Sequence, residues 1–230
     1  MIEQSNMISH EYIELAKRTY EAIILLRQND CPYSISIAGE SGCGKTSLSR
    51  NLKHLYHLED IAVDLYHQDD YFHLPPHDNH LARLSDIKLV GPQEVDLELL
   101  NKHIAASKQN DKRITKPLVN YNTNTTSTET LDSSQTQVVI VEGTYVSLLS
   151  GIDIKIFMSK DYRQTKNARY ARARDPLTPF NEKVLAVEHE IINAHKYKCW
   201  IWIDFHDQLS INESYAHPPE TRSDSSSLLI

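Results

Sequence analysis

One short segment carries the residue types that a bound nucleotide phosphate requires. Residues 39–46 read GESGCGKT and match the pattern GxxxxGK[ST]. Glycines at these positions let the backbone curl so that successive N–H groups point at phosphate oxygens, the lysine reaches the β- and γ-phosphates, and the following hydroxyl binds Mg²⁺. The sequence therefore predicts a P-loop with ATP and Mg²⁺ as cofactors. The residues expected at the nucleotide are Gly39, Ser41, Gly42, Cys43, Gly44, Lys45, Thr46 and Ser47, with Thr46 also a metal ligand.

A pair of acids follows the next β-prone run, residues 61–66. Asp69 and Asp70 stand there, directly before Tyr71 and Phe72. A carboxylate beside the γ-phosphate can accept the proton of an attacking hydroxyl, and aromatic rings can stack on a flat substrate. Asp69 is therefore a candidate catalytic base, and the three residues after it are candidates for substrate binding. The alternatives are a solvated acidic turn and, for the aromatic residues, packing in the core.

A third acid ends another apolar run. Residues 138–141 read VVIV, and Glu142 follows them. The carboxyl ends of parallel strands meet at one edge of a sheet, where ligands bind, so Glu142 is a candidate to help hold Mg²⁺. An N-cap or an exposed surface glutamate is the alternative.

Arginines gather in one helical stretch that ends at Asp175 and Pro176. Arginines that close over the γ-phosphate neutralise charge and exclude water, both of which accelerate phosphoryl transfer. A basic, solvated helix is the alternative for each of them. The stretch contains Arg163, Arg169, Arg172 and Arg174, and the last three are the candidate catalytic arginines.

The chain around these residues alternates between strand and helix patterns. Helical spacing of apolar residues occurs at 9–28, 46–56, 93–108, 161–174 and 180–196, and β-prone runs at 33–38, 61–66, 137–141, 153–158 and 199–203. This alternation predicts an α/β fold of the three-layer P-loop NTPase type, with a central parallel sheet, helices on both faces and a small lid.

One kinase domain is expected over residues 1–209. Its lid would lie at about 161–180 and its substrate segment at about 70–126. The polar tract 116–137 indicates a mobile loop or a hairpin. The serine-rich segment 210–230 is predicted to be a disordered tail.

Composition narrows the partners of the protein. A net charge of −7 argues against a nucleic-acid partner, and the chain has no signal-peptide pattern and no apolar run long enough to span a membrane. The three cysteines show no CxxC spacing, which fits a reducing cytoplasm, and the cluster His67, His73, His77 and His80 is better explained by loop residues than by a metal site. The partner expected is a small-molecule substrate, and the oligomeric state, including a homo-oligomer, stays open.

Five segments in order resemble the uridine kinase and phosphoribulokinase family: GESGCGKT, QDDYF, GPQEVDLELL, VVIVEG and the arginine-rich stretch ending in RD, across roughly residues 33–175. The resemblance implies that Asp69 is the catalytic base, that Lys45 and Thr46 serve ATP and Mg²⁺, and that Glu142 helps hold the metal. For the lid arginines, the resemblance implies only a collective role and no role for an individual arginine.

Two segments depart from the pattern of that family. The segment that usually grips base and ribose is KPLVNYNTNTT here, in which Tyr121 is the candidate counterpart of the family's tyrosine. After the base, LPPHDNHLARL replaces the Asp-x-x-x-Pro-type segment of the family, with Asp78, Asn79 and Arg83 as candidate substitutes, and Arg83 is the substrate-binding candidate.

The expected function is that of an ATP-dependent kinase that phosphorylates a hydroxyl of a small molecule, with uridine or cytidine as the favoured acceptor. One alternative is another acceptor, such as a phosphorylated sugar or a pantothenate-like compound. A phosphorylated acceptor would need extra basic residues, for which Arg83, Lys88 and Lys116 are available. The other alternative is a nucleotide-dependent switch without an acceptor, although no guanine-reading NKxD segment is present.

Overall fold

A six-stranded sheet forms the centre of the protein. The computed structural model describes residues 10–27, 31–172 and 178–212. The strands lie in the order β2-β5-β1-β6-β7-β8, and all are parallel except β8, which runs antiparallel to β7. The expected parallel α/β sheet is confirmed, and its edge is extended by an antiparallel strand. The strands are β1 (Tyr33–Gly39), β2 (Val63–His67), β5 (Val138–Gly143), β6 (Ile154–Met158), β7 (Ile201–Ile203) and β8 (Leu209–Ile211).

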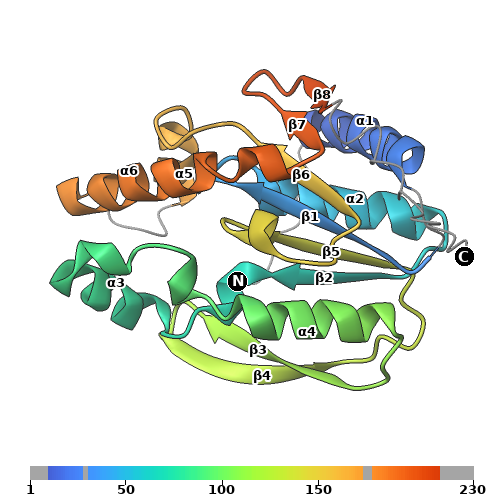
Figure 1. The fold of residues 1–230 in the computed structure, drawn as a ribbon, viewed down its shortest axis with the longest axis horizontal. Helices are drawn as coiled ribbons and strands as arrows, with labels where there is room; N and C mark the ends of the chain where they lie inside the picture. The colour runs from blue at the N-terminus through green and yellow to red at the C-terminus, as the bar shows by residue number, and fades with distance from the viewer. Residues whose placement is uncertain (1–9, 28–30, 173–177, 213–230) are drawn as a thin grey trace, which may run out of the picture.

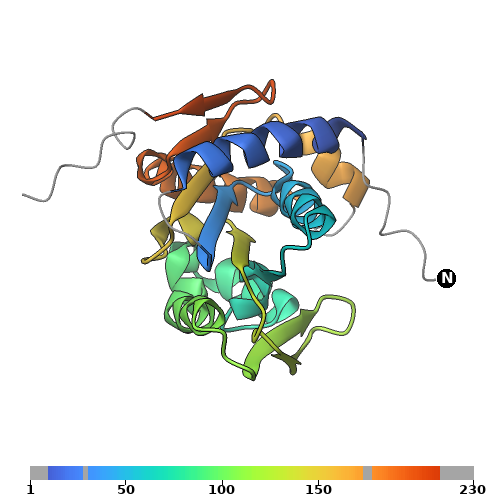
Figure 2. The same cartoon turned by 90° about the vertical axis from the view of Figure 1, so that its right-hand side faces the viewer.

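Helices cover both faces of this sheet (Figures 1 and 2). They are α1 (His10–Leu26), α2 (Lys45–Leu58), α3 (Pro76–Ser85), α4 (Leu97–Lys108), α5 (Lys166–Arg172) and α6 (Pro179–Asn193). Short 3-10 turns join them, namely η1 (Gln68–Tyr71), η2 (Ile87–Leu89), η3 (Pro92–Glu94), η4 (Val146–Leu148) and η5 (Lys196–Lys198). In the part of the chain that the structure describes, no helix has the length and apolar character to cross a membrane.

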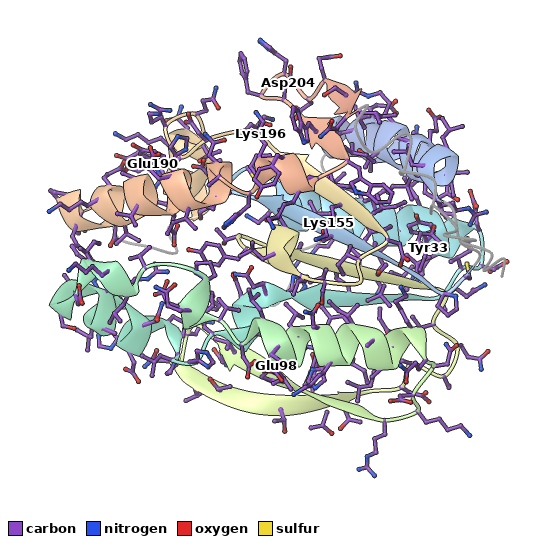
Figure 3. All side chains as sticks on the ribbon, viewed as in Figure 1. Tyr33, Glu98, Lys155, Glu190, Lys196 and Asp204 are labelled. Atoms are coloured by element: carbon purple, nitrogen blue, oxygen red, sulfur yellow. The ribbon has the colours of Figure 1, made fainter. Side chains whose placement is uncertain are left out.

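The central strands are buried on both sides because successive residues point to opposite faces. In β5, Val138 and Ile140 pack in the cluster under α1 and α2, whereas Val139 and Val141 pack in the cluster that includes residues of α4 and η4. Tyr33, labelled in Figure 3, lies in the first cluster at 1% exposure. Continuous apolar runs in the sequence are therefore explained by burial on two faces.

The polar tract forms a hairpin. Strands β3 (Ile114–Asn120) and β4 (Thr125–Leu131) pair antiparallel from Ile114 opposite Leu131 to Asn120 opposite Thr125, and lie beside α4 in Figure 1. Of the two structures expected for this tract, the hairpin is the one found.

Two elements were not predicted from the sequence. Residues 76–85 form helix α3 although the segment contains no apolar stripe, and none of the residues of α3 is buried. The expected tail boundary at 210 falls inside β8, because this strand completes the edge of the sheet, and residues 213–230 lie outside the described residues.

Candidate functional site

The GESGCGKT segment joins a strand to a helix as expected. β1 ends at Gly39 and α2 begins at Lys45, with Gly44 as the N-cap residue at φ 102°. At Gly42, where φ is 83°, a Cβ atom would lie 2.8 Å from Cγ of Arg169. Glycine is therefore required here by both conformation and space. Of the expected nucleotide contacts, Gly39 to Gly44 lie at the end of β1 and in this loop, and Lys45, Thr46 and Ser47 lie in the first turn of α2.

The P-loop lysine is held by its own loop. Lys45 Nζ donates a hydrogen bond of 2.8 Å to the carbonyl oxygen of Glu40. Cys43 is fully buried beneath the loop, and burial raises the pKa of its thiol. The side chain of Cys43 therefore packs in the core behind the P-loop, and Lys45 is the cationic residue of the loop.

A buried carboxylate lies beside the P-loop because of strand register. Parallel pairing puts Glu142 opposite Ile37 of β1 and opposite His67 of β2. Thr46 Oγ1 donates to Glu142 Oε1 over 2.8 Å, and His67 Nδ1 contacts the same oxygen at 2.8 Å. Burial acts to raise the pKa of Glu142, but hydrogen bonds from His67 and Thr46 and the charge of Lys45 outweigh it, so that its pKa lies below the usual value.

This pair of groups fits Mg²⁺. A hydroxyl and a carboxylate are hard oxygen donors, and Mg²⁺ in kinases is bound by one or two such groups together with phosphate oxygens and water. Thr46 and Glu142 already touch at the base of the P-loop, the place from which both reach the same ion. Within the described ranges, no group of three or more His, Cys, Asp and Glu residues could hold a metal ion.

The two adjacent acids after β2 have different surroundings. Asp69 and Asp70 both lie in η1, directly after the carboxyl end of β2. Asp70 is buried, with Oδ2 accepting from Lys116 Nζ at 3.0 Å and Oδ1 from the Val119 amide at 3.0 Å. Asp69 is only half-buried. Asp70 thus fastens the β3–β4 hairpin, and Asp69, the less buried of the two acids, stays the candidate base.

The aromatic residues that follow belong to the core. Tyr71 is 2% exposed and its hydroxyl contacts His103 Nδ1 at 2.9 Å, while Phe72 packs partly buried on the same cluster. Burial raises the pKa of Tyr71. For these two candidates the structure therefore favours the core-packing alternative, because their rings fill the space between η1 and α4. Tyr121 lies in the turn between β3 and β4, where it is exposed.

Arg83 links α3 to two other elements. Its guanidinium binds Glu94 through Nε at 2.5 Å and Nη2 at 2.9 Å, and its Nη2 also donates to Glu188 of α6 at 3.1 Å. Burial acts to lower the pKa of Arg83, but the two carboxylates raise it overall. Asn79 donates to Glu94 as well, and Asp78 is exposed on α3. The sequence did not single out Glu94 or Glu188.

The arginine-rich stretch lies partly against the P-loop. Arg169 is mostly buried, its Nη2 donating to the Tyr162 carbonyl at 2.9 Å, and its Cγ covers Gly42. Arg163 instead pairs with Asp161 on the surface. Arg172 ends α5, its side chain lying outside what is described, and Arg174 lies outside the described residues altogether.

Three residues at the P-loop were not expected. Glu40 Oε1 contacts His189 Nδ1 at 2.6 Å, and Glu40 Oε2 accepts from the Tyr162 amide at 2.6 Å. Thr165 Oγ1 donates to the Ser41 carbonyl at 2.9 Å. The only signal in the sequence is a glutamate inside the GxxxxGK[ST] segment, since His189 and Thr165 carry no motif.

Known proteins are similar to this chain in sequence. The bifunctional α-galactosidase/sucrose kinase AgaSK of Mediterraneibacter gnavus is 28% identical over 176 residues, which is 70% of this chain and 19% of that protein. The uridine kinase of Bacillus subtilis is 32% identical over 137 residues, 56% of this chain and 62% of that protein. The chain thus matches less than two thirds of the length of either relative.

The fold and the family follow from two further matches. The structure described as a possible uridine kinase from Bacillus stearothermophilus superposes with a TM-score of 0.55 at 19% identity, covering 79% of this chain and 95% of that one. The sequence model of the Phosphoribulokinase / Uridine kinase family matches residues 34–172, which include the P-loop, Asp69, Glu142 and Arg169. The chain therefore belongs to the phosphoribulokinase / uridine kinase family.

Proposed function

We propose that this protein is an ATP-dependent kinase that transfers the γ-phosphate to a hydroxyl group of a small molecule. The observation that carries the proposal is the convergence of four side chains at one edge of the sheet. Lys45 and Thr46 follow β1, Glu142 ends β5, and Asp69 follows β2. The names of the relatives, uridine kinase and sucrose kinase, support the same reaction class.

Each of these groups has a separate task in an in-line transfer. Asp69 orients the acceptor hydroxyl and takes its proton as the hydroxyl oxygen bonds to the γ-phosphorus, and the bond to the β-phosphate oxygen breaks to release ADP. Lys45 exchanges the Glu40 carbonyl for phosphate oxygens. Mg²⁺ held at Thr46 and Glu142 would neutralise charge on the β- and γ-phosphates. Arg169, whose side chain lies against Gly42, contributes positive charge at the loop.

The charges in the segments expected to bind the acceptor favour an acceptor without a phosphate group. Arg83 is paired with Glu94 and Glu188, and two of its nitrogens bind Glu94. Lys116 is paired with Asp70 and Glu129. Two of the three cations available for a phosphorylated acceptor are thus neutralised by carboxylates. We infer that the acceptor is uncharged, which argues against both sugar phosphates and pantothenate-like acids.

Two uncharged acceptor classes are then supported. A nucleoside, uridine or cytidine, is the first candidate because several relatives are named uridine kinases. An unphosphorylated sugar is the second, favoured by the burial of Tyr71 and Phe72 in the core and by the sucrose kinase named among the relatives. We further propose that one kinase domain contains a lid at about 161–180 and a substrate segment at about 70–126.

The test is ADP release from MgATP with a panel of acceptors. Uridine, cytidine, fructose, sucrose, ribulose 5-phosphate and pantothenate are compared with no acceptor, and Lys45→Ala provides the blank. We expect at least one uncharged compound to stimulate release well above the blank. Stimulation by ribulose 5-phosphate alone would overturn the charge argument, and hydrolysis that depends on Lys45 but on no acceptor would count against a kinase.

A further inference from the structure

The carboxylate of Glu40 connects three parts of the chain that lie far apart in the sequence. Glu40 stands inside the P-loop and is 6% exposed. One of its oxygens accepts from the backbone N–H of Tyr162, and the other contacts the imidazole of His189, both at 2.6 Å. One oxygen of this carboxylate therefore binds the arginine-bearing stretch, and the other binds α6.

The P-loop does not need such a group to bind phosphate. Phosphate is bound by backbone N–H groups, and a carboxylate there adds a negative charge close to a polyanion. A carboxylate at this place is unfavourable unless its charge is engaged elsewhere, and two hydrogen bonds of 2.6 Å engage it. Its role therefore concerns the elements it contacts.

Neighbouring contacts also hold the segment around Tyr162 against the P-loop and α6. Tyr162 packs edge-on against the ring of His189, with centroids 5.7 Å apart, and its carbonyl accepts from Arg169. Thr165 Oγ1 donates a hydrogen bond to the Ser41 carbonyl oxygen. The segment from Tyr162 to Arg169 is thus fixed to the P-loop at several points. Two of them also include α6: Glu40, through His189, and Arg169, which pairs with Glu182 at 3.4 Å.

We propose that Glu40 and His189 are a positioning pair that fixes the arginine-bearing stretch and α6 on the P-loop, so that the lid is aligned when nucleotide binds. The catalytic part of this inference rests on the proposed function. Lys45 Nζ donates a hydrogen bond to the backbone carbonyl of the same Glu40. The residue that anchors the lid through its side chain thus also holds the phosphate-binding lysine through its backbone.

A first experiment measures the contact without requiring an acceptor. Hydrogen exchange of the Tyr162 amide is followed in the wild type, in Glu40→Ala and in Glu40→Gln. We expect Glu40→Ala to accelerate this exchange about tenfold or more, the equilibrium worth of a hydrogen bond to a charged group. Glu40→Gln keeps an acceptor oxygen and an amide partner for the ring, so it should retain most of the protection.

A second experiment measures the consequence for chemistry. With the best acceptor, Glu40→Ala and His189→Ala should lower kcat roughly ten- to a hundredfold, as a displacement of about 1 Å does, with a smaller change in the KM for ATP. The ratio of ATP hydrolysed to acceptor phosphorylated should rise, because a displaced lid admits water. His189→Asn places an amide nitrogen near the position of Nδ1 and should rescue much of the loss.

Glu190→Gln is the matched control, since Glu190 lies next to His189 on α6 (Figure 3) and is exposed. It should leave exchange and turnover unchanged. The proposal is overturned if Glu40→Ala, shown to be folded by its melting curve, changes neither the exchange of Tyr162 nor the ratio of hydrolysis to transfer. If no acceptor stimulates the wild type, the proposed function fails, and the exchange experiment still decides whether Glu40 fixes the lid.

Discussion

Adjacent residues in this protein take different roles because each points to a different environment. Asp70 is buried against Lys116 and the backbone of Val119, whereas Asp69 is half-buried at the end of β2. A buried and paired carboxylate is held in place and cannot approach a substrate. Asp70 therefore has a structural role, and Asp69 is the base only in the function that we propose.

Replacement of Asp69 by asparagine tests this division. The amide keeps the shape of the carboxylate but is not a base, so we expect turnover to fall roughly a hundredfold or more, the usual contribution of a placed base. The affinity for MgATP, measured by a fluorescent nucleotide analogue, should change little. Asp111→Asn, at an exposed position on another loop, is the control. Unchanged turnover in Asp69→Asn would remove this residue from the role of base.

The sequence predicts residues well where backbone geometry dictates the residue type. GESGCGKT was found because a phosphate loop requires glycine at positive φ and a lysine and hydroxyl at the start of a helix. Glu40 and His189 were missed because they lie 149 residues apart and meet only after folding. Tyr71 and Phe72 were assigned to the substrate because an aromatic residue beside a catalytic acid looks the same in a sequence whether it faces a ligand or the core.

Among the elements, the β3–β4 hairpin depends on buried charge for its attachment. Lys116 is 3% exposed in its side chain and binds both Asp70 of η1 and Glu129 of β4, at 3.0 and 2.7 Å. Much of the outward face of β4 is exposed, so apolar packing there is limited. The hairpin is therefore connected to the segment that carries Asp69 largely by this charged group.

We predict that Lys116→Met lowers the free energy of unfolding by about 3–5 kcal/mol, because it leaves Asp70 buried without its cation. The double variant Asp70→Asn/Lys116→Met should regain much of this loss, since no uncompensated charge remains. Urea unfolding of the wild type, the two single variants and the double variant gives the coupling between the two side chains. Strictly additive losses would mean that the two side chains act independently.

Elements were predicted where periodicity is strong. The buried strands were found as apolar runs, and α2 and α6 by their spacing, since burial selects apolar side chains at those intervals. Helix α3 was missed because it buries no residue and because two prolines stand at its start, Pro75 as the N-cap and Pro76 as the first helical residue. Proline is tolerated in the first turn of a helix, so those prolines start α3 at Pro76 and do not prevent it.

At the scale of the whole molecule, the candidate site lies at the carboxyl ends of β1, β2 and β5, where the P-loop, Asp69 and Glu142 are found. α3 and α6 lie at this end of the sheet in Figure 1, and the ion pair between Arg83 and Glu188 joins them. Buried charged side chains therefore connect α3 to α6 near the candidate site. Because such side chains are buried, the free energy of unfolding depends on whether they are charged.

His103 of α4 shows this sensitivity. Burial lowers the pKa of His103 from its ordinary value of 6.5, the charge of Lys116 lowers it further, and Asp96 opposes both. The unfolded chain therefore binds a proton on His103 below pH 6.5 that the folded chain resists. This group reduces stability as the pH falls from 6.5 to the lowered folded pKa, and it has no effect on stability above pH 6.5, where it is neutral in both states.

We predict that His103→Asn flattens the fall in the free energy of unfolding between pH 6.5 and the folded pKa of His103. Asparagine offers an oxygen near the position of Nδ1 to the Tyr71 hydroxyl but does not titrate. Urea unfolding at a series of pH values measures the slope for each protein. His57→Asn, at an exposed histidine of α2, should leave the slope as in the wild type. If the His103 variant keeps the full slope, the loss of stability at acid pH comes from other groups, and the lowered pKa of His103 does not influence folding.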